Sequence, residues 1–153
     1  MRTLEYWLTT EPPEWAPPGT PSDRDCASAG LFDTPILIIE DESMIAWMIE
    51  DLLTDAGFTT IAVVASGAQA LEQVRAQAPG LILSDINLGA GEDGIATVRS
   101  IREKSIVPAI FVSGYADDGM RERIHSEIGA VTVLRKPVDR TALIAAVMRS
   151  LGN

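Results

Sequence analysis

The sequence predicts an α/β protein in which five parallel strands form one sheet with helices on both of its faces. Three observations support this prediction. Short apolar runs, typical of strands buried on both faces, recur from residue 35 onward. Segments with apolar residues at helical spacing separate these runs. Gly, Pro or Ser residues stand at several of the boundaries between the two kinds of segment.

Residues 36–39, Ile-Leu-Ile-Ile, form the first of these runs and are predicted to be a strand buried on both faces. Apolar residues then recur at helical spacing from Met44 to Leu53, which predicts a helix that Gly57 ends. Trp47 lies beside this apolar stripe. It is expected either at the edge of the core or in contact with a partner.

Residues 59–65 are predicted to be the second strand. Ser66 is a suitable N-cap for a helix that extends to about Ala78, with Leu71 and Val74 facing inward. A Pro-Gly pair then interrupts the chain before the third strand.

The third strand is predicted at residues 81–83, because Leu-Ile-Leu is short and apolar. A Gly-rich loop at 89–94 leads into a helix whose apolar face runs from Ile95 to Ile101. Pro108 opens a fourth strand that continues through Val112.

The remaining elements are a helix, a strand and a final helix. The helix at 116–128 is weaker because it contains Gly119, which costs about 1 kcal/mol relative to Ala in a helix. Residues 131–134 are predicted to be the fifth strand, and residues 140–151 the last helix.

Strands that alternate with helices leave few topologies once crossovers are right-handed. The natural one is a flavodoxin-like, doubly wound (βα)5 sandwich with strand order 2-1-3-4-5. In such a sheet the ligand lies beyond the carboxyl ends of the strands, where the strand order reverses. The residues directly after each strand are therefore the first candidates for function.

The first 34 residues differ from the rest, and we predict a flexible, Pro-rich tail at 1–34 ahead of a domain at 35–153. Six of the nine prolines fall within residues 12–35, and Pro-Pro pairs favour extended chain. Residues 4–8, Leu-Glu-Tyr-Trp-Leu, are the exception, since they have the composition of a short docking element.

Composition excludes several classes of function. The net charge of −10 disfavours direct contact with nucleic acid and with anionic membranes. The single cysteine, Cys26, allows no internal disulfide. No apolar run approaches the roughly 20 residues that span a bilayer, and the N-terminus does not resemble a signal peptide. These features predict a cytoplasmic protein.

Polar side chains follow four of the predicted strands, at the edge where a ligand is expected. They are Glu40 and Asp41 after the first strand, Asp85 after the third, Ser113 after the fourth and Lys136 after the fifth. Each has an ordinary structural explanation, such as a helix cap, a turn or a solvated charge. Together they predict one cleft that holds three carboxylates, a hydroxyl and an ammonium group.

Packed carboxylates repel one another, so a hard divalent cation is expected among them, and Mg²⁺ prefers oxygen ligands. Asp41 and Asp85 suit direct ligation, Glu40 suits ligation directly or through water, and a backbone carbonyl near Asn87 would add another ligand.

Phosphoryl transfer fits the same cleft. Asp85 has the carboxylate needed for attack on phosphorus, as in aspartyl-phosphate chemistry. Lys136 offers a cation and Ser113 a hydroxyl donor for the transferred group.

Over about residues 35–151 the sequence resembles the response-regulator receiver family, also called the CheY-like family. Glu40-Asp41 matches its acidic pair, Asp85 its phosphoacceptor, Ser113 its switch residue and Lys136-Pro137 its Lys-Pro pair. The resemblance implies that Asp85 accepts a phosphoryl group from phosphohistidine on a sensor histidine kinase or a histidine phosphotransfer protein, with Mg²⁺. It implies self-phosphorylation and autodephosphorylation, not turnover of a substrate.

Two features depart from the commonest family pattern. Val133 occupies a position that is usually aromatic. Residues 111–115, Phe-Val-Ser-Gly-Tyr, partly resemble the stand-alone receivers of the FAT GUY type. Because Val133 lacks the reach of the usual aromatic side chain, the switch is expected at Ser113 and at Tyr115, two residues further on. The sequence ends two residues after the last predicted helix, so we expect signalling through a downstream protein partner without a fused output domain. A piece of a longer protein is the alternative.

The competing hypothesis is a Mg²⁺-dependent phosphatase with an Asp nucleophile. Haloacid-dehalogenase-like phosphatases carry Asp-x-Asp after their first strand, whereas this chain has Glu40-Asp41-Glu42 there. A third hypothesis is a binding module that acts without phosphorylation. His125, the only histidine, is expected at the surface and away from the cleft.

Overall fold

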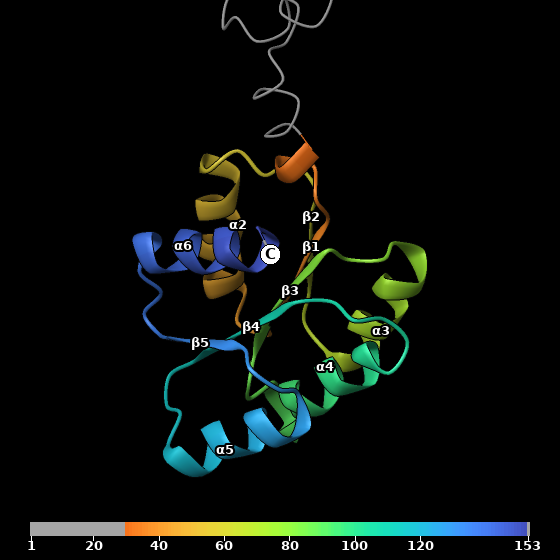
Figure 1. Ribbon diagram of the computed structural model, residues 1–153, viewed down its shortest axis with the longest axis vertical. Coiled ribbons are helices and arrows are strands. Elements are labelled where there is room, and N and C mark those ends of the chain that lie inside the picture. The colour runs from red at the N-terminus through yellow and green to blue at the C-terminus, as the bar shows by residue number, and fades with distance from the viewer. Residues whose placement is uncertain (1–29, 153) are drawn as a thin grey trace, which may run out of the picture.

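The computed structural model describes residues 30–152. Their strands form one parallel sheet in the order β2-β1-β3-β4-β5, which confirms the predicted class and topology (Figure 1). The strands are β1 (Ile36–Ile39), β2 (Ile61–Val64), β3 (Leu81–Asp85), β4 (Ala109–Ser113) and β5 (Thr132–Arg135).

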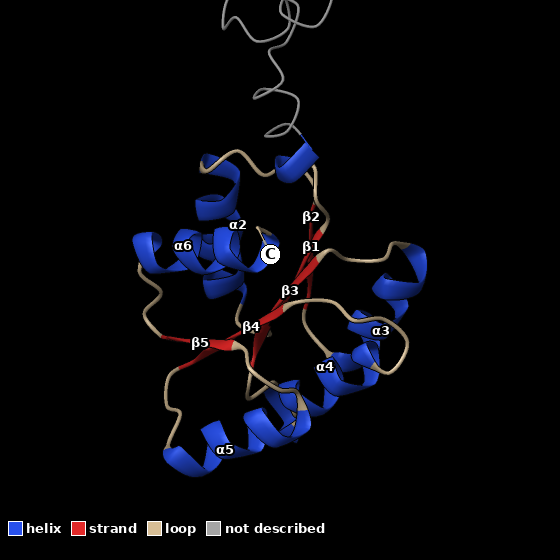
Figure 2. Cartoon of the chain, viewed as in Figure 1, coloured by secondary structure: helices blue, strands red, loops and turns tan. Residues whose placement is uncertain are grey.

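Helices cover both faces of the sheet (Figure 2). Two of them, α2 (Ser43–Asp55) and α6 (Arg140–Leu151), pack on one face. The other face carries α3 (Gly67–Ala76), α4 (Gly94–Arg102) and α5 (Asp118–Glu127), with a short 3-10 turn at Gly89–Gly91. Within the described residues, each helix is too short or too polar to cross a bilayer.

The apolar strands divide their side chains between two cores. In β1, Ile36 and Ile38 point into the core beneath α2 and α6, whereas Leu37 and Ile39 point into the core beneath α3, α4 and α5. The three central strands, β1, β3 and β4, are buried at every position. This two-sided burial is why the strands lack polar alternation in the sequence.

Side-chain caps set where most helices begin. The predicted N-cap is confirmed, because Ser66 Oγ accepts the Gln69 N–H at 3.2 Å. Asp117 caps α5 in the same way by accepting the Met120 N–H at 2.8 Å, so this helix begins later than predicted.

Three apolar residues face outward. The sequence predicts an inward position for Met44 and Leu71, and for Trp47 either the edge of the core or contact with a partner. Met44 is 82% exposed, Trp47 65% and Leu71 37%. The buried face of α2 centres on Ala46 and Ile49, and Met44 and Trp47 lie off that face at about 100° per residue. Trp47 is therefore a surface residue and does not line the edge of the core.

Residues 30–34 pack on the domain, although their composition predicts that they belong to the tail. Phe32 meets Phe58 edge to face, with ring centroids 5.2 Å apart. The Thr59 N–H donates to the Phe32 carbonyl at 3.1 Å, and the Thr59 hydroxyl donates to Asp33 Oδ1 at 2.9 Å. The rest of the predicted tail, including residues 4–8 and Cys26, lies outside the described residues.

Candidate functional site

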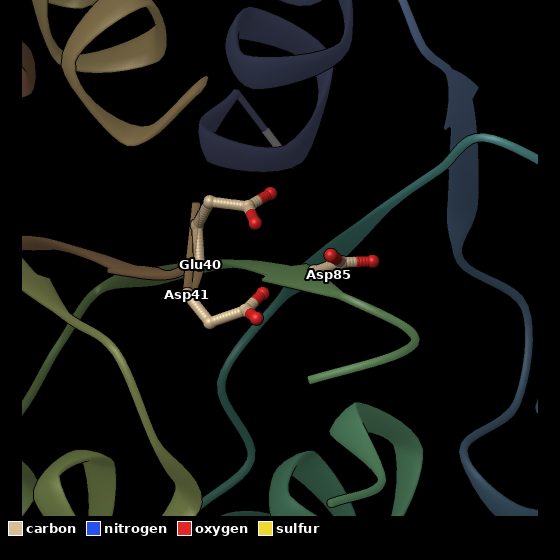
Figure 3. A group of neighbouring side chains, drawn as sticks. All are labelled: Glu40, Asp41 and Asp85. Carbon is tan, nitrogen blue, oxygen red and sulfur yellow. The ribbon is translucent and has the colours of Figure 1, made fainter. Parts of the chain in front are cut away.

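The carboxyl ends of β1 and β3 bring three carboxylates together (Figure 3). Ile39 pairs with Ser84, so the residues that follow β1 lie beside Asp85. Glu40 and Asp85 are buried, at 3% and 6% exposure, and Asp41 is exposed. One oxygen from each of the three side chains lies within 4.8 Å of the others.

Lys136 lies between two of these carboxylates. Its Nζ is 2.9 Å from Glu40 Oε2 and 3.0 Å from Asp85 Oδ2. Burial alone would lower the pKa of Lys136, but the bonds to Glu40 and Asp85 outweigh burial and the pKa is raised. The ammonium group therefore stays protonated at the site.

Burial raises the pKa of Glu40, and the close ammonium group of Lys136 and the hydrogen bond from the Glu42 N–H offset this only in part. Although Lys136 forms a close ion pair with Glu40 Oε2, this buried oxygen accepts no well-aligned hydrogen bond from the described residues. Three carboxylates and one ammonium group leave the cluster with excess negative charge.

A tight loop fixes the backbone around Asp85. The Asn87 N–H donates to Asp85 Oδ1 at 3.1 Å, and the Gly94 N–H donates to the Ile86 carbonyl at 2.8 Å. A Cβ at Gly94 would lie 1.8 Å from the Asp85 carbonyl oxygen. Only glycine permits this approach, which sequence reasoning did not identify.

Ser113 and Tyr115 form a compact turn at the end of β4. The buried Ser113 hydroxyl donates to the Tyr115 carbonyl at 2.7 Å and accepts the Tyr115 N–H at 3.2 Å. The Lys136 N–H donates to the Ser113 carbonyl at 2.9 Å, so the turn adjoins the carboxylate cluster. Among the described residues, the Ser113 hydroxyl makes no hydrogen bond to Asp85.

The structure thus brings Glu40, Asp41, Asp85 and Lys136 into one cluster and places Ser113 at the same edge of the sheet. The Asn87 N–H points to this cluster, while the residue itself is exposed. His125 is exposed, as predicted, and lies on α5.

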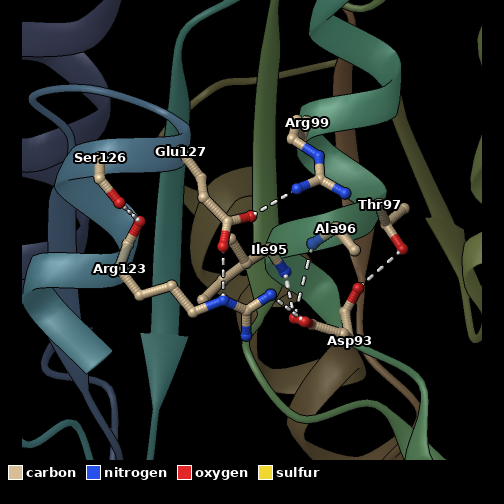
Figure 4. Close-up of polar contacts among 8 residues, drawn as sticks. All are labelled: Asp93, Ile95, Ala96, Thr97, Arg99, Arg123, Ser126 and Glu127. Carbon is tan, nitrogen blue, oxygen red and sulfur yellow. Dashed lines mark hydrogen bonds and ion pairs between the residues drawn. The ribbon is translucent and has the colours of Figure 1, made fainter. Parts of the chain in front are cut away.

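An ionic network links the loop after Asp85 to α5 (Figure 4). Asp93 caps α4 by accepting the Ile95 N–H at 2.9 Å, and its other oxygen pairs with Arg123 of α5. Arg123 Nε also bonds Glu127 at 2.7 Å, and Glu127 in turn pairs with Arg99 at 2.8 Å. Asp-Gly ahead of an apolar helix is a capping signal in the sequence, but no sequence pattern joins Asp93 to Arg123.

Comparison with known proteins agrees with this arrangement. The profile of the response regulator receiver domain matches residues 36–148. The transcriptional regulatory protein TorR of Escherichia coli K12 is 35% identical over 116 residues, which are 76% of this chain and 49% of TorR. CseB of Streptomyces coelicolor is 35% identical over 123 residues, covering 78% of this chain and 51% of CseB.

Two solved structures show the same likeness in three dimensions. The REC domain of the PhyR response regulator from Erythrobacter litoralis has a TM-score of 0.68 and 31% identity, covering 78% of this chain and 91% of that domain. The N-terminal domain of a response regulator/sensory box/GGDEF protein from Carboxydothermus hydrogenoformans has a TM-score of 0.69 and 33% identity, with coverage of 77% and 94%.

The curated relatives are longer proteins, since this chain spans about a quarter to a half of their length. The family profile and the PhyR structure from Erythrobacter litoralis both correspond to a receiver domain. The family match covers most of this chain and includes every residue of the carboxylate cluster and Lys136. The chain therefore belongs to the response regulator receiver domain family of two-component systems.

Proposed function

We propose that Asp85 is the residue of this receiver that accepts a phosphoryl group. The observation that carries the proposal is its position at the end of a central strand, in contact with Lys136 and next to the carboxylates of Glu40 and Asp41. Its Oδ1 is oriented by the Asn87 N–H, and its Oδ2 faces the ammonium group.

The donor is a phosphohistidine of a sensor histidine kinase or of a histidine phosphotransfer protein. An oxygen of the Asp85 carboxylate attacks the phosphorus atom, the bond between phosphorus and the histidine nitrogen breaks, and the imidazole leaves. The product is an acyl phosphate on Asp85. Attack by water on this phosphorus atom later returns the free carboxylate and releases inorganic phosphate.

The carboxylate cluster fits Mg²⁺. All of its ligand atoms are oxygens, and the single positive charge of Lys136 does not neutralise the three carboxylates. The buried Glu40 Oε2 also accepts no well-aligned hydrogen bond from the described residues. Asp41 and Asp85 would hold the ion, with Glu40 as an auxiliary ligand and the backbone carbonyl of Asn87 as a further one. When bound, Mg²⁺ offsets the negative charge of the phosphoryl oxygens.

Lys136 and Ser113 complete the proposed site. Lys136 already contacts Asp85 at 3.0 Å, so its ammonium group is placed to pair with an oxygen of the transferred group. Ser113 donates its hydroxyl to the Tyr115 carbonyl in the unphosphorylated protein. Donation to a phosphoryl oxygen would require that this bond be given up.

Release of that bond is the step that carries the signal to Tyr115. The Tyr115 side chain is 73% exposed and lies beside a cavity of about 120 Å³ that Val133 helps to line. A small side chain at Val133 leaves this cavity open, which suits entry of the Tyr115 ring when the turn loosens. The proposed switch is thus Ser113 with Tyr115, in the manner of the FAT GUY type.

The output is proposed to be contact with a downstream protein, without turnover of a small substrate. The net charge of −10 supports a protein partner over nucleic acid or an anionic membrane. A cytoplasmic location stays a prediction.

The test is reaction with acetyl phosphate and Mg²⁺, read by intact mass. The wild-type chain should gain one phosphoryl group, and Asp85→Asn should gain none. Asp51→Asn, an exposed carboxylate on α2, is the matched control and should behave as wild type. Labelling of Asp85→Asn at the wild-type rate would refute the assignment. Steady turnover of p-nitrophenyl phosphate would favour the competing phosphatase.

A further inference from the structure

A hollow of about 880 Å³ opens between α5, α6 and the first residues of β4 and β5. Pro108 and Val131 line it and precede these strands, so it lies at the edge of the sheet opposite Asp85. In Figure 1, α5 and α6 lie on either side of β5. Apolar side chains form much of the wall, and Ile106 at its margin is 92% exposed.

The hollow is also positively charged. Three arginines and the only histidine line it: Arg102, Arg121, Arg149 and His125. Among residues 30–152, no carboxylate lines it. Arg102 donates to the Ile128 carbonyl at 3.1 Å and Arg149 to the Ala145 carbonyl at 3.3 Å, which are neutral acceptors. Within the described part of the chain, none of the three arginines forms an ion pair. A chain of net charge −10 thus carries an uncompensated basic hollow.

We propose that residues 4–14 of the same chain bind in this hollow. This segment contains three acidic side chains, Glu5, Glu11 and Glu14, and no basic one. It also holds four large apolar or aromatic residues: Leu4, Tyr6, Trp7 and Leu8. Carboxylates form charge-assisted hydrogen bonds with guanidinium groups, and arginine also stacks on indole and phenol rings. The segment therefore matches both the charge and the apolar wall of the hollow.

The chain enters the domain at the correct edge for this contact. Residues 30–35 precede β1, and in a parallel sheet they lie at the same edge as the residues that precede β4 and β5. Residues 15–29 would connect the segment to the domain, and an extended chain of this length spans up to roughly 50 Å. That reach exceeds the diameter of about 30 Å expected for a domain of this size.

Occupancy of the hollow would also touch the switch region. Arg121 lines both the hollow and the small cavity beside Tyr115. A carboxylate that binds Arg121 in the hollow would therefore restrain a side chain that also lines the cavity beside Tyr115. The docking itself does not depend on the proposed phosphorylation of Asp85.

The experiment uses the full chain with a nitroxide spin label at Thr9→Cys in a Cys26→Ser background. Paramagnetic broadening of backbone amides is measured by NMR. Amides that line the hollow, such as those of His125 and Val131, should lose most of their signal. The amide of Asn87, at the opposite edge, should keep its signal. Uniform signal across these amides would refute the proposal and leave the hollow open to an acidic partner.

Charge reversal separates specific docking from proximity. Arg121→Glu combined with Arg149→Glu should abolish the broadening, whereas Arg75→Glu, an exposed arginine on α3, should leave it intact. Equal broadening in both variants would contradict an ionic contact. In a mixture of spin-labelled chain with isotope-labelled, spin-free chain, the hollow should show no broadening. Broadening there would assign the hollow to a second copy and overturn the proposal.

Discussion

Substitution of Gly94 by alanine should destabilise the domain, because the new methyl group would meet backbone atoms. A Cβ at this position would lie 1.8 Å from the Asp85 carbonyl oxygen and 3.0 Å from Ser84 Oγ. The carbonyl belongs to a buried central strand and cannot rotate away as a flexible side chain would. The loop and the first turn of α4 must therefore shift together.

The expected size follows from two opposing effects. Overpacking in a well-packed interior costs about 1–3 kcal/mol, and a backbone contact this close belongs at the upper end. Alanine recovers about 0.5–1 kcal/mol because it restricts the unfolded chain more than glycine does. A net loss of about 2 kcal/mol is expected, which lowers Tm by roughly 6–10 °C for a domain of this size.

Urea unfolding and thermal melts of Gly94→Ala measure this loss, and Gly119→Ala is the matched control. Gly119 lies in the exposed first turn of α5, where an added Cβ comes no closer than 3.5 Å to Asp117 Oδ1. The same substitution there should raise stability by up to about 1 kcal/mol. Wild-type stability of Gly94→Ala, or equal effects at the two glycines, would refute the steric argument.

Three further outcomes are expected. Phe32→Ala should lower the free energy of unfolding by about 1–3 kcal/mol, because the ring is only partly buried against Phe58, and unchanged urea denaturation would show that Phe32 does not stabilise the domain. Arg123→Gln should cost about 1 kcal/mol or less, since the side chain is 38% exposed, and the difference from wild type should shrink at high salt, whereas a salt-independent loss would contradict an ionic role. Tyr115→Ala should leave phosphorylation by acetyl phosphate unchanged and reduce the change in amide hydrogen exchange over residues 113–128; changes centred on 131–135 instead would contradict the proposed switch.

The sequence was sufficient to predict the fold because the strands are short apolar runs and several boundaries carry a Gly, Pro or capping residue. The strand order followed from general rules on parallel sheets. The cluster of Glu40, Asp41, Asp85 and Lys136 was predictable for the same reason, since strand ends meet at one edge.

Other features depend on contacts between distant parts of the chain. The role of Gly94 depends on how closely α4 approaches β3, and the pairing of Asp93 with Arg123 joins residues 30 positions apart. The nearby prolines dominate the local composition and predict that Phe32 belongs to the tail, although its ring packs against Phe58. Helical spacing predicts an apolar stripe that starts at Met44, but it does not give the exact centre of the buried face, and Met44 is exposed.

The way α5 is attached to the domain has a consequence for how this receiver can diverge. Ile124 is its only fully buried side chain, whereas Arg123 and Glu127 hold it through ion pairs to α4 and its cap. Substitutions of Arg123 or Glu127, which are partly exposed, would change how easily α5 can move without creating cavities in either core. Such substitutions can therefore alter how firmly α5 is held while the packing of both cores stays the same.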